Sequence, residues 1–117
     1  MKNELRNAYF AGLIDGEGCV MMKSAGSGQR RRPFVKVNMT CQKTVEAIKE
    51  AFGLGCISYK PPPKNQPTWK PQWEWTVTSK SAILVLEAVL PYLITKRAAA
   101  EEVYAQRFIK KEKRLSK

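Results

Sequence analysis

"YFAGLIDGEGCV", residues 9–20, joins an apolar segment to two carboxylates. Tyr9 to Ile14 contains no charged side chain, and Asp15 and Glu17 follow within three residues. Apolar residues at this density do not fit a helix with one solvent-facing side, so the pattern predicts a helix that is buried on opposite sides. Such a helix needs two packing partners, and it carries its acids at one end.

The charge of the whole chain points to a polyanionic partner. The 117 residues include 21 Lys and Arg against 10 Asp and Glu, which gives a net charge of +11. No long apolar run or basic amphipathic stretch accompanies this excess, so it favours nucleic acid over a membrane or a small-molecule substrate. A generic basic surface is the alternative. The length predicts one domain, residues 1–112, followed by a basic tail at 113–117.

The residues that are rare or absent narrow the chemistry. The chain has no histidine, so hydrolysis would have to use carboxylates, lysine or a metal-bound water. Its three cysteines are far apart, which predicts neither a disulfide framework nor a zinc site. The first residues contain no apolar signal core, so we expect a protein that is not secreted and that lies in the cytoplasm or in an organelle.

The remaining pattern predicts two β-hairpins separated and followed by helices. We expect helices at 4–15, 44–52, 79–90 and from about Thr95, and strands at 18–24, 33–42, 55–60 and 72–79. The expected helix ends are marked by Gly16 and Gly18, by Thr44 and Ser79 as N-caps, and by Gly53 and Pro91 as stops. The order α-β-β-α-β-β-α-α is an α+β fold, with helices covering one face of a curved, saddle-shaped antiparallel sheet.

The uncovered face of that sheet is predicted to be polar. In the second strand, Val35 and Val37 alternate with Lys36 and Asn38, and the fourth strand alternates in the same way. Polar strand faces often meet only solvent. With the basic charge, however, they also suit the DNA major groove. We therefore expect DNA contacts from Lys23, Arg30, Arg31, Arg32, Lys36, Asn38, Thr40, Ser58, Lys60, Gln72, Glu74 and Thr76. A carboxylate on this face, Glu74, would accept from a cytosine amino group.

Residues 10–18, "FAGLIDGEG", resemble the motif of the LAGLIDADG homing endonucleases, with Phe, Gly and Glu replacing three of its residues. "QKT" at 42–44 and "LPYLITKR" at 90–97 also look like segments of that family. The resemblance spans nearly the whole chain. It implies the family's αββαββα core and a site-specific double-strand DNA endonuclease, of the kind encoded by mobile introns or free-standing genes.

The same resemblance assigns roles to individual residues. It implies that the Glu17 carboxylate and the Gly16 carbonyl bind Mg²⁺ (or Mn²⁺), that Lys96 stabilises the transition state, and that Gln42 orders water. Asp15 matches a structural position of the motif at the helix end, so we expect it to pack there or cap its own helix. The basic residue that the family often carries after "QKT" is absent, because Val45 and Glu46 stand there.

The motif helix also predicts a second copy of the chain. Gly12 and Gly16 are four residues apart, so they stack on one side of the helix and permit close approach of another. The chain holds one such helix, which favours a two-fold homodimer with Tyr9, Gly12, Leu13 and Gly16 at its interface. Two Glu17 carboxylates would then meet at the axis, where a hard divalent cation relieves their repulsion.

The leading hypothesis is therefore a homodimeric, Mg²⁺-dependent homing endonuclease acting on a long pseudo-palindromic duplex. A DNA- or RNA-binding relative that does not cleave, such as a maturase or regulator, is the alternative. A basic ribonucleoprotein component is a third, and it would leave the motif helix unexplained.

Overall fold

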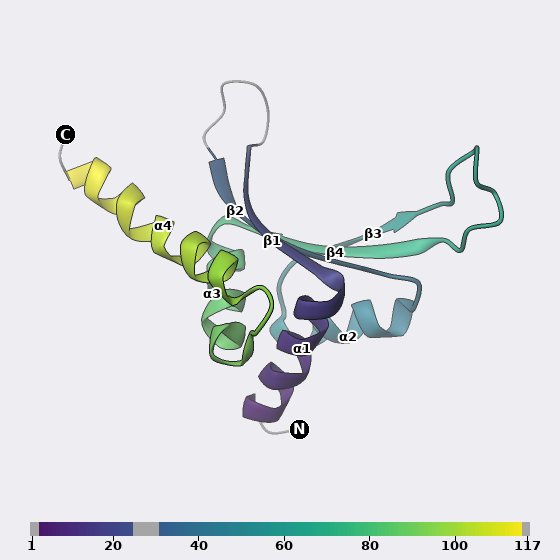
Figure 1. The fold of residues 1–117 in the computed structure, drawn as a ribbon, viewed down its shortest axis with the longest axis horizontal. Helices are drawn as coiled ribbons and strands as arrows, with labels where there is room; N and C mark the ends of the chain where they lie inside the picture. The colour runs from purple at the N-terminus through teal and green to yellow at the C-terminus, as the bar shows by residue number, and fades with distance from the viewer. Residues whose placement is uncertain (1–2, 25–30, 116–117) are drawn as a thin grey trace.

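The chain forms a four-stranded antiparallel sheet with its helices on one side (Figure 1). The structure, a computed structural model, describes residues 3–24 and 31–115, with side chains as far as Gln106. The elements are α1 (Asn3–Glu17), β1 (Gly18–Ser24), β2 (Arg31–Met39), α2 (Gln42–Phe52), β3 (Cys56–Lys60), β4 (Gln72–Thr78), α3 (Ser79–Val89), a 3₁₀ turn η1 (Leu90–Tyr92) and α4 (Arg97–Leu115). This order confirms the predicted α+β fold.

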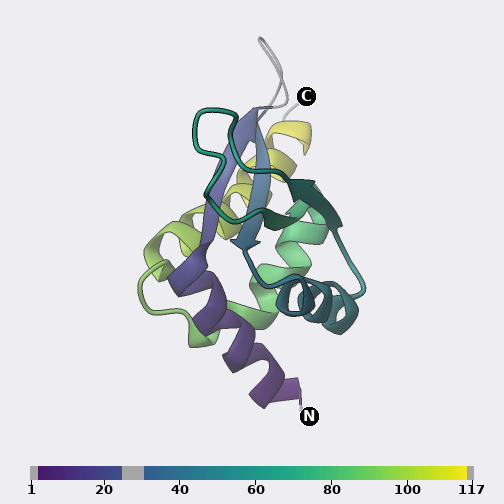
Figure 2. The same ribbon diagram turned by 90° about the vertical axis from the view of Figure 1, so that its right-hand side faces the viewer.

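The sheet has the order β1-β2-β4-β3, so the two hairpins meet through β2 and β4. Figure 1 shows the hairpins β1–β2 and β3–β4 extending in different directions from this centre, above the helices. Figures 1 and 2 both show α1 running away from the sheet to the N-terminus, on the same side of the sheet as α2 and α3. One face of the curved sheet is therefore left without a helix.

The core lies between the central strands and the helices. Val35, Val37 and Trp75 are fully buried and face Ile48 and Leu86 from the helical layer. Each buried side chain of this size contributes about 1.5 to 3 kcal/mol relative to an exposed one. The indole of Trp75 donates to the Leu54 carbonyl at 2.9 Å, so burial leaves its one polar group satisfied.

Several predicted element ends are wrong by two or three residues. Helix α1 continues through Gly16 to Glu17, because the chain enters β1 directly instead of turning away. Strand β2 ends at Met39, so Thr40 and Gln42 do not lie on a strand. Helix α4 begins at Arg97 rather than near Thr95.

The two predicted N-caps are also wrong. Cys41 precedes α2 in an extended conformation, and Thr44 lies inside the helix, since Gln42 and Lys43 are good helix formers that extend it backwards. Thr78 precedes α3, and neither cap residue uses its side chain as a cap. The predicted stops are confirmed: Gly53 ends α2 with φ at 65°, and Pro91 lies in the turn that follows α3.

Within the described residues, no helix is both long enough and apolar enough to cross a membrane.

Candidate active site and nucleic-acid interface

The end of α1 presents Glu17 to solvent at the junction between helix and sheet. Glu17 is the last helical residue, and β1 begins at Gly18 with no intervening loop. A Cβ at Gly18 would lie 2.8 Å from the Ile14 carbonyl oxygen and 2.9 Å from the Ile14 Cα. Only glycine fits there, so the glycine after Glu17 is required for the chain to pass from helix to strand.

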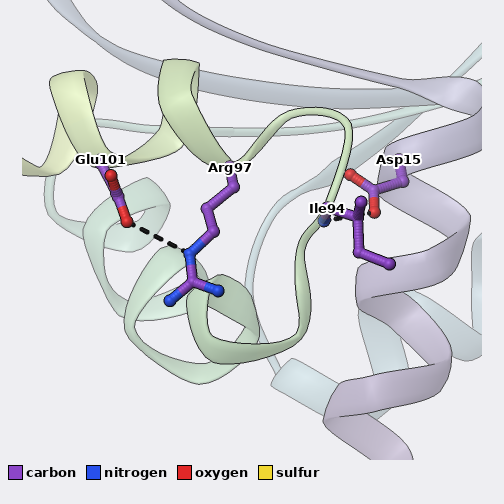
Figure 3. Close-up of polar contacts among 4 residues, drawn as sticks. All are labelled: Asp15, Ile94, Arg97 and Glu101. Carbon is purple, nitrogen blue, oxygen red and sulfur yellow. Dashed lines mark hydrogen bonds and ion pairs between the residues drawn. The ribbon is translucent and has the colours of Figure 1, made fainter.

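Asp15 joins α1 to the segment that precedes α4. Its carboxylate accepts hydrogen bonds from the backbone N–H of Ile94 at 2.8 Å and of Lys96 at 3.0 Å. Figure 3 shows the carboxylate turned toward Ile94. Asp15 therefore binds the segment that leads into α4 and does not cap the end of its own helix. Its partner Ile94 lies 79 residues later in the chain.

These contacts set the ionisation of Asp15. Burial raises the pKa of its carboxyl, but the backbone N–H groups of Lys96, Ile94 and Thr95 and the charge of Lys96 outweigh it. The pKa of Asp15 consequently lies below its ordinary value, so the carboxylate is ionised at neutral pH.

Lys96 lies between the ends of two helices. Its Nζ atom donates to the Asp15 carbonyl at 2.8 Å, and its own carbonyl accepts from Ala100 in the first turn of α4. The positive end of α4 disfavours a cation there, but the negative C-terminal end of α1 offsets it. Arg97 and Glu101, four residues apart, form an exposed ion pair at 3.2 Å along this first turn (Figure 3). The structure thus brings Lys96 to the end of α1, beside the segment that carries Gly16 and Glu17.

Gln42 has a different environment. It is the exposed first residue of α2, and its side-chain amide donates to Glu46 at 3.0 Å. Among the described residues, the Gln42 side chain forms this one hydrogen bond, so the structure does not join Gln42 to Glu17 or Lys96. Val45, at the position where the family often has a basic residue, is fully buried.

The strand register gathers most of the predicted DNA contacts on the sheet face that no helix covers. Lys36 lies opposite Thr76, Ser58 opposite Glu74, and Lys60 opposite Gln72. The alternation along the strands assigns nine of the twelve residues to this open face: Lys23, Arg32, Lys36, Asn38, Ser58, Lys60, Gln72, Glu74 and Thr76. The others differ: Arg31 alternates with the core-facing set, Thr40 is exposed after β2, and Arg30 is outside the described residues.

Glu74 is the centre of an ion-pair cluster on the open face. Its carboxylate lies 3.6 Å from the Lys36 Nζ and 3.3 Å from the Lys60 Nζ, and its side chain is only 14% exposed. A carboxylate held by two lysines already has cationic partners, so its role includes positioning them. Opposite Glu74, the Oδ1 atom of Asn38 is buried and has no hydrogen-bond partner among the described residues.

Sequence reasoning missed an apolar site on the open face. Met21 of β1 lies directly opposite Phe34 of β2, and the Lys23 Nζ stands 4.5 Å from the centre of the Phe34 ring. The alternation around Val35 could have placed Phe34 on the polar side. A second missed residue is Trp69, 58% exposed in the segment that joins β3 to β4.

One side of α1 is apolar and uncovered. Phe10 and Ile14 are buried against the core, and Leu13 packs partly against it. Tyr9 is 56% exposed, and a Cβ placed at Gly12 or Gly16 would meet no atom within 4 Å. The predicted two-sided helix therefore has one partner within its own chain, and its glycine side faces open space.

Comparisons with solved structures give the family of this fold. The chain aligns with the homing endonuclease I-CvuI, solved in complex with its target in the presence of 2 mM Ca, at a TM-score of 0.71 and 25% identity. The match covers 88% of this chain and 66% of I-CvuI. The LAGLIDADG meganuclease I-AabMI bound to uncleaved DNA aligns at a TM-score of 0.69 and 23% identity, over 93% of this chain and 39% of that one. The archaeal intron-encoded homing endonuclease I-Vdi141I, complexed with DNA, aligns at 0.61 and 22%, over 82% and 62%.

Sequence comparison alone finds no match, either to a family model or to a curated protein. The structural neighbours nevertheless agree with one another, and they agree with the motif at residues 10–18. This chain has the fold of the LAGLIDADG homing endonucleases.

Proposed function

We propose that this chain is a site-specific endonuclease that cuts double-stranded DNA as a metal-dependent homodimer. The observation that carries the proposal is the contact between the Lys96 Nζ and the Asp15 carbonyl at 2.8 Å. It puts a cation at the helix end that presents Glu17, so a carboxylate and an ammonium group lie at the same end of α1. The neighbours solved with DNA support the substrate class.

The donor set at this site suits a hard divalent cation. Glu17 is exposed and forms no ion pair or hydrogen bond within the described residues, so its carboxylate is available. The Glu17 carboxylate and the Gly16 carbonyl would hold Mg²⁺ or Mn²⁺ through oxygen atoms. Such an ion, when bound, lowers the pKa of water and stabilises charge on the scissile phosphate. Lys96 would orient and neutralise that phosphate. The presence of Ca in the I-CvuI structure agrees with this choice.

One chain supplies half of the required groups. The described residues contain no cluster of three or more His, Cys, Asp or Glu side chains, and each chain contributes a single Glu17. A duplex has two strands to cut, and the glycine side of α1 offers a surface for a second copy. The 39% coverage of I-AabMI fits a chain that corresponds to one half of a larger enzyme.

The test is a cleavage selection on a randomised duplex library with the purified chain. Mg²⁺ should return a pseudo-palindromic site that is cut on both strands, whereas Ca²⁺ should support binding. Glu17→Gln should bind the selected site in Ca²⁺ and fail to cut it in Mg²⁺. Cleavage by Glu17→Gln at the parent rate would refute the assignment of the metal ligand.

A DNA- or RNA-binding protein without cleavage is the second candidate, and the Gln42–Glu46 hydrogen bond favours it. Val45 and Glu46 stand where the family often has a basic residue, and the Glu46 carboxylate engages the amide that would order water. A parent protein that binds a duplex or an RNA tightly, but cuts no DNA in Mg²⁺ or Mn²⁺, would select this reading.

A further inference from the structure

The open face of the sheet holds one exposed apolar side chain. Met21 is 41% exposed, and among the exposed large apolar residues of the described chain it is the one on this face. Around it the face carries lysine, threonine, serine, glutamine and glutamate side chains. A single exposed apolar side chain is common on protein surfaces. Met21, however, lies on the face that we propose contacts DNA, where it would be in reach of base edges.

Phe34 supports Met21 from the neighbouring strand. It is directly opposite Met21 in the β1–β2 ladder and opposite Thr78 in the β2–β4 ladder. Although it points away from the helical core, it is only 8% exposed, and the Lys23 Nζ covers its ring at 4.5 Å. The Phe34 ring is therefore buried beneath a cation, and Met21 lies beside it as its cross-strand neighbour.

The major groove presents one apolar group along its base edges. The C5-methyl of thymine is that group, and the remaining edge atoms are hydrogen-bond donors or acceptors. The cations beside Met21, Lys23 on its own strand and Arg32 opposite Lys23, suit the flanking phosphates. We propose that Met21, supported by Phe34, determines specificity by packing on a C5-methyl group of thymine or 5-methylcytosine. This inference rests on the proposed function.

The chain also places the contact within the target. Met21 follows Glu17 by four residues, and β1 begins directly after Glu17, so the two Cα atoms lie about 13 Å apart at about 3.3 Å per residue. At 3.4 Å per base step this distance corresponds to about three to five base pairs. The methyl group should therefore lie about three to five base pairs from the cleaved bond in each half-site.

The experiment removes single methyl groups from the selected duplex. Each thymine is replaced in turn by uracil in both half-sites, and the dissociation constant is measured in Ca²⁺. One symmetric pair, about three to five base pairs from the cut, should weaken binding about fourfold for each half-site, the effect of about one buried methyl group. Placing 5-methylcytosine rather than cytosine there distinguishes recognition of the methyl from recognition of the thymine O4 atom.

Met21→Ala should abolish the uracil effect at that pair and leave the effects at other positions unchanged. Met22→Ala, the adjacent methionine on the core-facing side, is the matched control and should keep the parent profile, with folding checked by thermal unfolding. A selected site without thymine in this window, or an unchanged uracil profile in Met21→Ala, would overturn the inference while leaving the endonuclease intact. Failure to bind any duplex would overturn the proposed function, and this contact with it.

Discussion

Replacing Gly12 by alanine should stabilise the folded chain and weaken the proposed dimer. In one chain the new Cβ would meet no atom within 4 Å, so the fold has no steric need for glycine there. Alanine in a helix interior is better than glycine by about 0.5 to 1 kcal/mol. For a domain of this length, that gain raises the midpoint of thermal unfolding by about 2 to 4 °C.

The effect on the dimer should have the opposite sign. If the glycine side of α1 packs on its two-fold copy, Gly12→Ala inserts two methyl groups into a close contact. Overpacking costs about 1 kcal/mol or more for each insertion, hence about 2 kcal/mol for the pair. At 1.4 kcal/mol for each tenfold change, the dimer dissociation constant should rise about thirtyfold.

Sedimentation equilibrium gives the dissociation constant, and thermal unfolding below that concentration gives the stability of the single chain. Gly18→Ala is the contrasting variant, because its Cβ would approach the Ile14 carbonyl oxygen to 2.8 Å and should destabilise the chain itself. A Gly12→Ala protein that dimerises with parental affinity would refute α1 as the interface. A parent that sediments as one chain at high micromolar concentration would refute the dimer.

Asp15→Asn should lower the free energy of unfolding by about 1 kcal/mol at pH 7, because a neutral amide accepts the two backbone N–H groups less strongly. Since the folded pKa of Asp15 is depressed, this contribution is complete above its unfolded pKa and is lost as pH falls through the folded value. If urea unfolding gave the same difference in free energy between parent and variant from pH 7 to pH 3, the result would contradict this. Glu74→Gln should release Lys36 and Lys60, raise affinity for random duplex and steepen its salt dependence by about one phosphate contact per chain. If the logarithm of the binding constant kept the same slope against the logarithm of salt concentration over about 50 to 200 mM, the result would argue against that cluster. Lys96→Met should reduce single-turnover cleavage about 100-fold with little change in target affinity, and equal losses of both would place Lys96 in binding instead.

Local sequence carried much of this structure. Alternation in β2 and β4 separated the core face from the open face, because side chains on a strand change sides at each residue. The motif at residues 10–18 indicated a helix with acids at its end, and both were found there. These features depend on residues that are close together in the chain, so they can be predicted from the sequence alone.

What the sequence did not reveal depends on pairings between distant segments. Glu74 meets Lys36 only because β2 and β4 are adjacent, with Asn38 opposite Glu74, and no local pattern encodes that register. Asp15 was expected to finish its own helix, but its partners belong to the start of α4. Thr44 predicts the start of α2 two residues too late, because the helix-forming residues Gln42 and Lys43 precede it in the helix.

The uninterrupted passage from Glu17 into β1 also has a consequence for engineering. No loop separates Glu17 from the strand that carries Met21 and Lys23. Under the proposed function, the number of residues between them would therefore fix the spacing between the cleaved bond and the contacted bases. Exchanging side chains on β1 should then change which bases are preferred. Adding or deleting one residue there would instead turn every following side chain to the opposite face, so retargeting must proceed by substitution rather than by changing length.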